Sequence, residues 1–227
     1  MGGGKIRSVI LGLNDGLIST FTLLVGVAAA TLVTTGGNAI VILTGIAAMV
    51  SGAISMGLGE YISSKSEYNY IKNEIKKEKA EIQLFPEEER QEVKELCREL
   101  GLEGDLLKGC VDSITSKEDT WINFLLKSEL VLEEPESPLI GAILTFLSFV
   151  LGSFIPQLPY FLNLGFNSLV ISSILSFEAL FFAGALKTKI TGESKIKGGL
   201  EMVIIGVVAF IASYGIGTIL EQIVPVI

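Results

Sequence analysis

Residues 16–59 read GLISTFTLLVGVAAATLVTTGGNAIVILTGIAAMVSGAISMGLG and contain no charged side chain. A helix needs about 20 apolar residues to cross the hydrocarbon core of a bilayer, so these 44 residues are enough for two crossings. The run is interrupted at Thr34-Thr35-Gly36-Gly37-Asn38, a composition that is typical of a turn. The stretch therefore predicts one membrane helix near 8–33 and a second near 39–63.

Two more charge-free stretches, 137–177 and 202–220, extend this pattern. The first breaks at Pro156-Gln157-Leu158-Pro159, where two prolines cannot continue a helix. Together the two stretches predict three more spans, near 138–156, 166–187 and 198–221. The expected fold class is all-α: a polytopic membrane protein with five transmembrane helices and a helical domain outside the bilayer.

The charges are concentrated between the second and third spans. Of the 17 basic and 25 acidic residues, 11 and 19 lie in residues 64–137, so this insert carries the whole net charge of −8. An acidic insert excludes a nucleic-acid-binding surface, which would have to be basic, and favours cations as partners. The absence of His excludes His-based catalysis, and no enzymatic activity is expected. Cys97 and Cys110 lack CxxC spacing, so neither a thiolate zinc site nor a redox pair is expected.

Basic residues in short segments set the orientation. Lys5 and Arg7 precede the first span, and four lysines at 187–197 lie between the fourth and fifth, whereas the loops at 34–38 and 157–165 have none. With five spans, all the basic segments fall on one side, which is the cytoplasmic side. The N-terminus and the insert are therefore predicted to be cytoplasmic. The expected division is 1–63 (two spans), 64–137 (cytosolic acidic helical metal-binding domain) and 138–227 (three spans).

The insert itself is predicted to be helical. Residues 64–84 continue the second span into the cytosol until Pro86 breaks the run. Helices are expected near 87–100 and 103–114. A further helix is expected to open at the capping-box pattern Ser116-Lys117-Glu118-Asp119 and to run through Trp121.

Four residues in or at the end of the spans are candidates for an ion path. Asp15 and Glu178 interrupt apolar runs, and an ionisable group at membrane depth usually marks a functional path or a buried partner. Met56 offers a soft thioether ligand, although a lone Met is more often core filler. Glu60 ends the second span near the cytosol. Gly12 and Gly16, around Asp15, have the GxxxG spacing that permits close helix approach.

The insert carries two pairs of glutamates three residues apart, Glu78 with Glu81 and Glu89 with Glu92. Such pairs share a helix face, and a corner at Pro86 would bring the two faces together. Four carboxylates without His or Cys favour hard or borderline divalent cations. The alternative is a solvated acidic surface, because such pairs arise easily in an acidic segment.

The chain resembles the vacuolar iron transporter family, whose members exchange cytosolic Fe²⁺ for protons. The similarity runs from about Ile6 to Leu220 and depends on the order and spacing of many modest motifs. These are Asp15-Gly16-Leu17 with Phe21 and Gly26; Gly52-Ala53-Ile54-Ser55-Met56-Gly57 with Glu60-Tyr61; Glu78, Glu81, Pro86, Glu89, Glu92 and Val93; Trp121-Ile122-Asn123-Phe124, Glu129-Leu130, Glu133 and Pro135; and Ile155-Pro156 with Leu158-Pro159-Tyr160.

The resemblance implies a homodimer of five-span protomers with the ion path between them. Asp15 and Met56 match the family's path residues. Glu78, Glu81, Glu89, Glu92 and Glu129 match the carboxylates of its cytosolic metal-binding domain. Three departures stand out: the family's paired methionines are Leu125 and Leu126 here, an acidic residue of plant members is Ala48, and Glu178 is not part of the family's pattern.

The leading expectation is a transporter of Fe²⁺, with Mn²⁺ next, that moves metal out of the cytosol in exchange for protons. The insert would instead be a membrane-anchored ferroxidase or iron-storage module if the spans were only an anchor. The missing His and the intramembrane Asp15 count against that alternative. A third alternative is a scaffold protein with a solvated acidic domain. The short N-terminus shows no organelle-targeting extension, which favours a prokaryotic plasma membrane over a vacuolar membrane.

Overall fold

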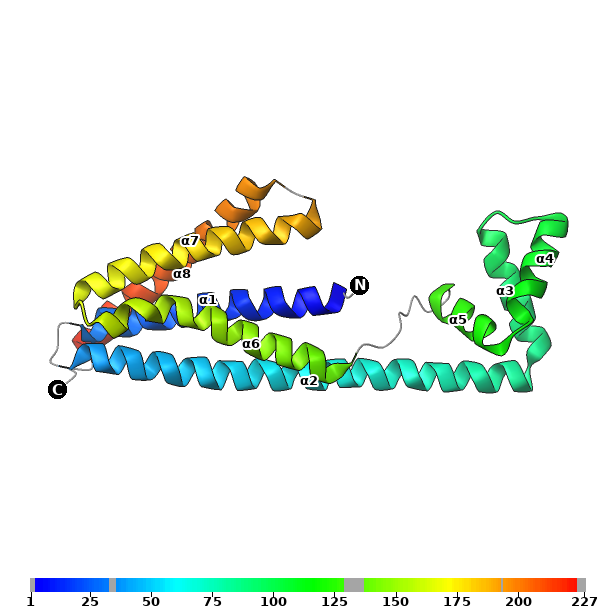
Figure 1. Cartoon of the computed structure of the whole chain (residues 1–227), viewed down its shortest axis with the longest axis horizontal. Helices are drawn as coiled ribbons and strands as arrows, with labels where there is room; N and C mark the ends of the chain where they lie inside the picture. The colour runs from blue at the N-terminus through cyan, green and yellow to red at the C-terminus, as the bar shows by residue number, and fades with distance from the viewer. Residues whose placement is uncertain (1–2, 33–35, 129–136, 193, 224–227) are drawn as a thin grey trace. The chain divides into compact units, whose positions relative to one another are not determined.

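A computed structural model describes residues 3–32, 36–128, 137–192 and 194–223, with the backbone alone at residues 3 and 189–191. Within these ranges the chain is helical and has no strand. Figure 1 shows the helices in order. They are α1 (Gly3–Thr31), α2 (Gly37–Leu84), α3 (Pro86–Glu99), α4 (Gly104–Thr115), α5 (Glu118–Ser128), α6 (Pro138–Gln157), the 3₁₀ helix η1 (Leu158–Leu162), α7 (Phe166–Thr191) and α8 (Lys195–Ile223).

Five of these helices, α1, α2, α6, α7 and α8, are long and apolar enough to cross a membrane. The five predicted spans are therefore confirmed, with small differences at their ends. The first span begins at Gly3 rather than near residue 8, since Lys5 and Arg7 continue the helix beyond its apolar part. The third ends at Gln157, where Pro159 in the following 3₁₀ turn stops the α-helix.

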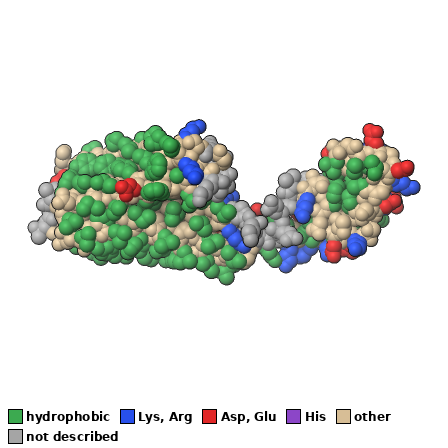
Figure 2. Space-filling view, turned by 45° about the horizontal axis from the view of Figure 1, so that its top comes forward, with side chains coloured by type: hydrophobic (Ala, Val, Ile, Leu, Met, Phe, Trp, Pro, Cys, Tyr) green, Lys and Arg blue, Asp and Glu red, His purple; other side chains and the backbone are tan. Residues whose placement is uncertain are grey.

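The described chain divides into two compact units. The span unit contains Met1–Ile62 and Leu139–Ile227, and the insert unit contains Ser63–Pro138. Helix α2 belongs to both, because it runs without a break from the second span into the insert. Figure 2 shows hydrophobic side chains over most of the visible face of the span unit, and acidic and basic side chains gathered on the insert unit.

Helix α1 packs closely against α6 through glycines. A Cβ atom on Gly12 would lie 2.6 Å from the Thr145 carbonyl oxygen, and one on Gly16 would overlap the carbonyl of Phe149. The hydroxyl of Ser153 donates to the Gly16 carbonyl at 3.1 Å. The GxxxG spacing thus brings the two backbones together, which fixes the rotation of α1 about its axis.

Aromatic side chains fill the space between α1, α7 and α8. The ring of Phe21 lies edge-on to Phe177 at 5.4 Å and stacks on Phe210 at 6.1 Å, and Phe210 stacks in turn on Tyr214. Edge-to-face and stacked pairs at these distances add to the free energy gained by burial. These contacts hold one side of α1 against α7 and α8.

The insert unit has its own apolar core. It contains Ile82, Val93, Cys97, Leu107, Val111, Trp121, Ile122, Leu125 and Leu126, from α2, α3, α4 and α5. The predicted break at Pro86 is present: Phe85 leaves the helical conformation and Pro86 opens α3. α5 begins at Glu118, so Ser116 lies one residue before its N-cap position, and its hydroxyl donates to the Ser113 carbonyl at 2.7 Å.

Candidate functional site

Two contacts fix the register between α1 and α2, which run antiparallel. At the end of the spans from which α2 continues into the insert, the Ser8 hydroxyl donates to Glu60 at 2.8 Å. Near the far end, Leu24 Cδ2 lies 2.8 Å from the position of a Cβ atom on Gly45. The residue numbers add to 68 for Ser8 and Glu60 and to 69 for Leu24 and Gly45. Because this sum stays constant along an antiparallel pair of helices, Asp15 is level with residues 53–54 of α2. Met56 therefore lies two to three residues, or roughly 3–4.5 Å, nearer to the Ser8–Glu60 contact than the level of Asp15.

The side chain of Asp15 lies on an uncovered face of α1. The face also carries Leu11, Ser19 and Leu23, each one turn from the next, and the two leucines are 46% and 38% exposed. Asp15 lies on this face because Gly12 and Gly16 must face α6. Among the described residues the Asp15 carboxyl group has no hydrogen bond or ion pair, and a carboxyl group within an apolar span usually faces a polar path or partner.

Met56 is half-buried on α2. Its neighbours along the helix, Gly52 and Gly57, face α6, where added Cβ atoms would meet the rings of Phe149 and Phe146. Met56 therefore lies beside this packed surface and not within it. The position leaves the thioether partly accessible, as a ligand must be.

Glu60 lies between α1 and α6 at the end of the spans from which α2 continues into the insert. One carboxylate oxygen accepts the hydrogen bond from Ser8, which is 3% exposed. A Cβ atom on Gly141 would lie 3.1 Å from the same oxygen. The sequence alone does not indicate Ser8 or Gly141, since neither small residue forms a recognisable motif with Glu60.

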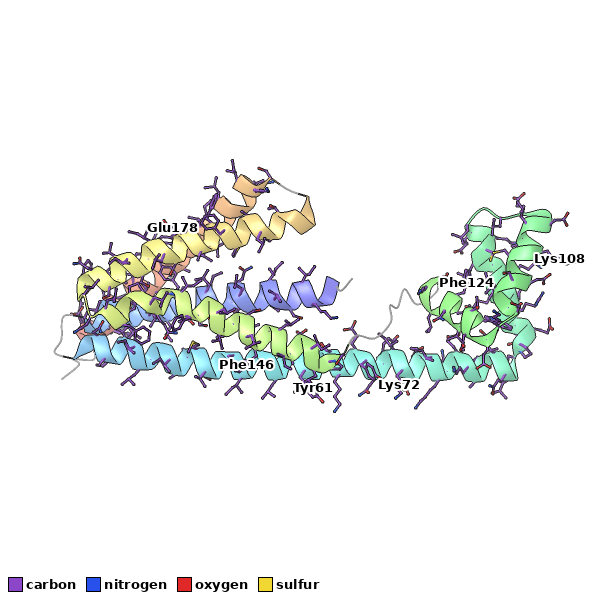
Figure 3. All side chains as sticks on the ribbon, in the orientation of Figure 1. Tyr61, Lys72, Lys108, Phe124, Phe146 and Glu178 are labelled. Atoms are coloured by element: carbon purple, nitrogen blue, oxygen red, sulfur yellow. The ribbon has the colours of Figure 1, made fainter. Side chains whose placement is uncertain are left out.

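Glu178 is placed apart from the other three path candidates. It is exposed, and it lies on the opposite side of α7 from the buried residues Ser172, Ser176 and Leu180 (Figure 3). Ile174 and Phe182, one turn to either side, are 53% and 70% exposed. The structure therefore brings Asp15, Met56 and Glu60 to neighbouring levels of one helix pair and leaves Glu178 on an outer face.

The four glutamates singled out in the insert are shielded more than their described acidic neighbours, except for Glu74, which is also half-buried. Glu78 is only 4% exposed and interrupts a buried stripe of α2 formed by Ile71, Ile75 and Ile82. Glu81, Glu89 and Glu92 are half-buried. By contrast, the other glutamates of α3 are exposed: Glu87, Glu88, Glu95 and Glu99. Burial of a carboxylate is costly without a compensating cation or donor, so shielding sets these four apart from a solvated surface.

The four carboxylates come from adjoining helices but do not form a preassembled cage. In the part of the chain that the structure describes, no three His, Cys, Asp or Glu side chains lie close enough together to hold a metal ion. Glu81 forms an ion pair with Lys77 at 3.8 Å. The fifth candidate, Glu129, lies outside the described residues, as do Glu133 and Pro135 of the family motif.

The two leucines that replace the family's methionines belong to the apolar core. Leu125 is fully buried and Leu126 is 6% exposed. At these positions the chain therefore uses hydrocarbon packing and offers no sulfur ligand. Ala48 is half-buried on α2, two turns before Met56, and leaves that level without a carboxylate.

The structure brings together two cysteines whose spacing in the sequence does not predict a pair. Cys97 on α3 and Cys110 on α4 have their sulfur atoms 3.6 Å apart. Burial raises the pKa of the Cys97 thiol to about 11, and the neighbouring Cys110 adds to the rise. Helical spacing with Val93 indicates that Cys97 faces the core, but it says nothing of which α4 residue lies opposite.

Known proteins resemble this chain over almost its full length. Residues 6–218 match the model of the VIT family. The protein named vacuolar iron transporter 1 of Arabidopsis thaliana is 34% identical over 97% of this chain and 88% of its own length. The rice protein of the same name, from Oryza sativa subsp. japonica, is 34% identical over 94% of this chain and 84% of its own. Protein CCC1 of Saccharomyces cerevisiae is 32% identical over 90% of this chain and 65% of its own. With five apolar helices and these relatives, the chain is a multi-pass membrane protein that belongs to the VIT family.

Proposed function

We propose that the chain is a divalent-metal transporter that moves Fe²⁺, and also Mn²⁺, out of the cytosol in exchange for protons. The relatives named as iron transporters support iron as the cargo. The acidic insert, with its net charge of −8, supports the cytosol as the side from which cations are collected.

One observation carries the proposal: Glu60, Met56 and Asp15 follow one another along the antiparallel pair of α1 and α2. Met56 is one turn from Glu60, or roughly 6 Å along the axis, and the level of Asp15 is roughly 3–4.5 Å beyond Met56. An ion that entered at Glu60 would find a ligand at each of the next two levels. The pair thus provides a carboxylate, a thioether and a second carboxylate in sequence from the cytosolic end.

The chemistry of these groups suits a borderline divalent ion. Carboxylate oxygen and thioether sulfur together favour Fe²⁺ over Mg²⁺ or Ca²⁺, which take oxygen ligands almost exclusively. Asp15 binds the ion when ionised and releases it when protonated. A proton arriving from the far side of the membrane would therefore displace the ion on that side, which couples the two movements.

The shielded glutamates of the insert are proposed to collect the ion. Glu78, Glu81, Glu89 and Glu92 lie on α2 and α3 on either side of the break at Pro86, with Glu129 as a fifth ligand. Because the described carboxylates do not form a closed cage, we expect weak, exchangeable binding. Weak binding suits a delivery site, since a tightly held ion would not move on.

The uncovered face of α1 supports a homodimer. A second copy placed on Leu11, Asp15, Ser19 and Leu23 would shield Asp15 from lipid and complete the path between protomers. The two plant relatives are named for the vacuole and give no support to the plasma-membrane preference. We therefore propose a direction of transport, out of the cytosol, without assigning the membrane.

The experiment that tests the proposal is Fe²⁺ uptake into proteoliposomes by the full chain and three variants. Asp15→Asn and Met56→Leu should lose most of the uptake, because each removes a ligand while keeping the size of the side chain. Glu178→Gln is the matched control: it also neutralises a carboxylate within a span, but on a face away from the proposed path. Retained uptake in Asp15→Asn would refute the assigned path. Metal binding without uptake by the folded wild type would favour an anchored storage module.

A further inference from the structure

Two thiols lie in contact inside the insert unit. The Cys97 thiol donates a hydrogen bond to the sulfur of Cys110 across 3.6 Å, between α3 and α4. Cys97 has no exposed surface, whereas Cys110 is half-buried at the edge of the same core. In the described residues no third metal-binding side chain joins them, so the pair is not a metal site.

The fold holds the two sulfurs together from both ends of the α3–α4 hairpin. At one end the helices are joined by a short turn in which Gly101 and Gly104 adopt positive φ angles of 83° and 58°. At the other end Arg90 donates to Thr115 at 2.8 Å and pairs with Asp112. The sulfur contact therefore follows from the packing of the hairpin and not from a chance approach of two flexible side chains.

We propose that Cys97 and Cys110 are a thiol-oxidation site, which forms a reversible disulfide across α3 and α4 when the protein meets a peroxide. A disulfide has a sulfur–sulfur distance of about 2.05 Å, so the sulfurs must approach by roughly 1.6 Å. Disulfides in a reducing cytosol are usually transient and redox-sensing, so the pair rests as thiols and closes only under oxidation.

The reaction has two balanced steps. Hydrogen peroxide first converts the thiol of Cys110 to a sulfenic acid, and one water leaves. The sulfur of Cys97 then attacks the sulfenic sulfur, the S–S bond forms and a second water leaves. Two thiols and one peroxide thus give one disulfide and two waters. Cys110 reacts first because it reaches solvent, while burial keeps Cys97 neutral until its neighbour is oxidised.

The proposal does not depend on metal transport, and it is tested on the full-length protein in detergent. The reduced protein is treated with hydrogen peroxide, denatured in acid and alkylated, and the blocked thiols are mapped by peptide mass spectrometry. We expect both cysteines to be blocked, a single peptide linking Cys97 to Cys110 within one chain, and full recovery of both thiols with dithiothreitol.

Single variants separate the roles of the two residues. In Cys97→Ser, Cys110 should stop at the sulfenic acid, which a dimedone probe captures. In Cys110→Ser, the buried Cys97 should keep its thiol under the same treatment. Fluorescence of Trp121, the sole tryptophan and part of the same core, checks that each variant is folded. Wild-type protein that keeps both thiols, or that cross-links only between chains, would overturn the proposal, and so would Cys97 oxidation in Cys110→Ser at the wild-type rate.

Discussion

Glu78 shows how burial distinguishes one acidic residue from many. The insert contains 19 acidic residues, and their spacing alone does not separate ligands from solvated charges. Glu78 occupies a position in the stripe Ile71, Ile75 and Ile82 where an apolar residue would pack without cost. A carboxylate buried at such a position needs a donor or a cation to compensate for its lost hydration, which distinguishes Glu78 from the solvated acidic residues.

This leads to a prediction about metal affinity. In the full chain, Glu78→Gln should weaken Mn²⁺ binding at least about tenfold, since even groups that only support a ligand commonly cost 10–100-fold when removed. Isothermal titration with Mn²⁺, which resists oxidation in air better than Fe²⁺, measures the affinity. Glu87→Gln is the control, because Glu87 is exposed at the start of α3 and its loss should leave affinity nearly unchanged. Equal effects in the two variants would mean that only general acidity matters.

The thiol of Cys97 gives a prediction about pH. Its pKa rises from 9.0 to about 11 on folding, so the folded state favours the neutral thiol. The stabilisation is complete below pH 9 and is lost as the pH rises from about 9 to about 11. Urea unfolding followed by Trp121 fluorescence should show the midpoint falling across this window. Cys97→Ala should show a smaller fall; the same fall in both proteins would assign the effect to other groups.

At the scale of helices, charge segregation was sufficient to predict the spans. Lipid provides no water to satisfy the backbone, so a charge-free run of sufficient length must be a helix, and turn residues end it. The break at Pro86 and the continuation of α2 into the insert were also predictable, from proline chemistry and from helical spacing. In α3, Val93 and Cys97 are four residues apart on one face of the helix, and both are buried.

The side of each span that packs against its neighbours could not be predicted from one sequence. Lipid-exposed and buried surfaces are both apolar there, so periodicity does not reveal which side of a span faces its neighbours. Glu178 illustrates the limit: its position in an apolar run predicts an ionisable group within a span, but not that it lies on the exposed side of α7. The Cys97–Cys110 contact likewise depends on how two helices pair, which local sequence does not encode.

Helix packing by glycine can be tested with two positions on α8. A Cβ atom on Gly217 would overlap the carbonyl of Gly26 on α1, whereas one on Gly215 would meet nothing within 4 Å. Gly217→Ala should therefore destabilise the protein by about 1–3 kcal/mol, the usual cost of overpacking. Gly215→Ala should be neutral or slightly stabilising. Thermal unfolding in detergent compares them, and equal melting temperatures would contradict the close approach of α1 and α8.

At the scale of the whole molecule, the proposed dimer predicts a specific cross-link. In a background of Cys97→Ser with Cys110→Ser, Ser19→Cys places a thiol on the uncovered face of α1. Oxidation in membranes should link two chains through this position. Ile211→Cys, on α8 and also exposed at 64%, should remain monomeric on a denaturing gel. The opposite pattern would place the interface on α8 and leave Asp15 facing lipid.

Coupled exchange of metal for protons is tested most directly by following both ions at once. Purified wild-type protein in proteoliposomes would be given external Fe²⁺ under anaerobic conditions, with one dye reporting metal inside and another reporting internal pH. We predict that an acidic interior drives Fe²⁺ inward, that the interior becomes more alkaline as metal enters, and that an alkaline interior slows uptake. Fe²⁺ entry at the same rate under both gradients, without any change in internal pH, would contradict proton exchange and leave a simple metal channel.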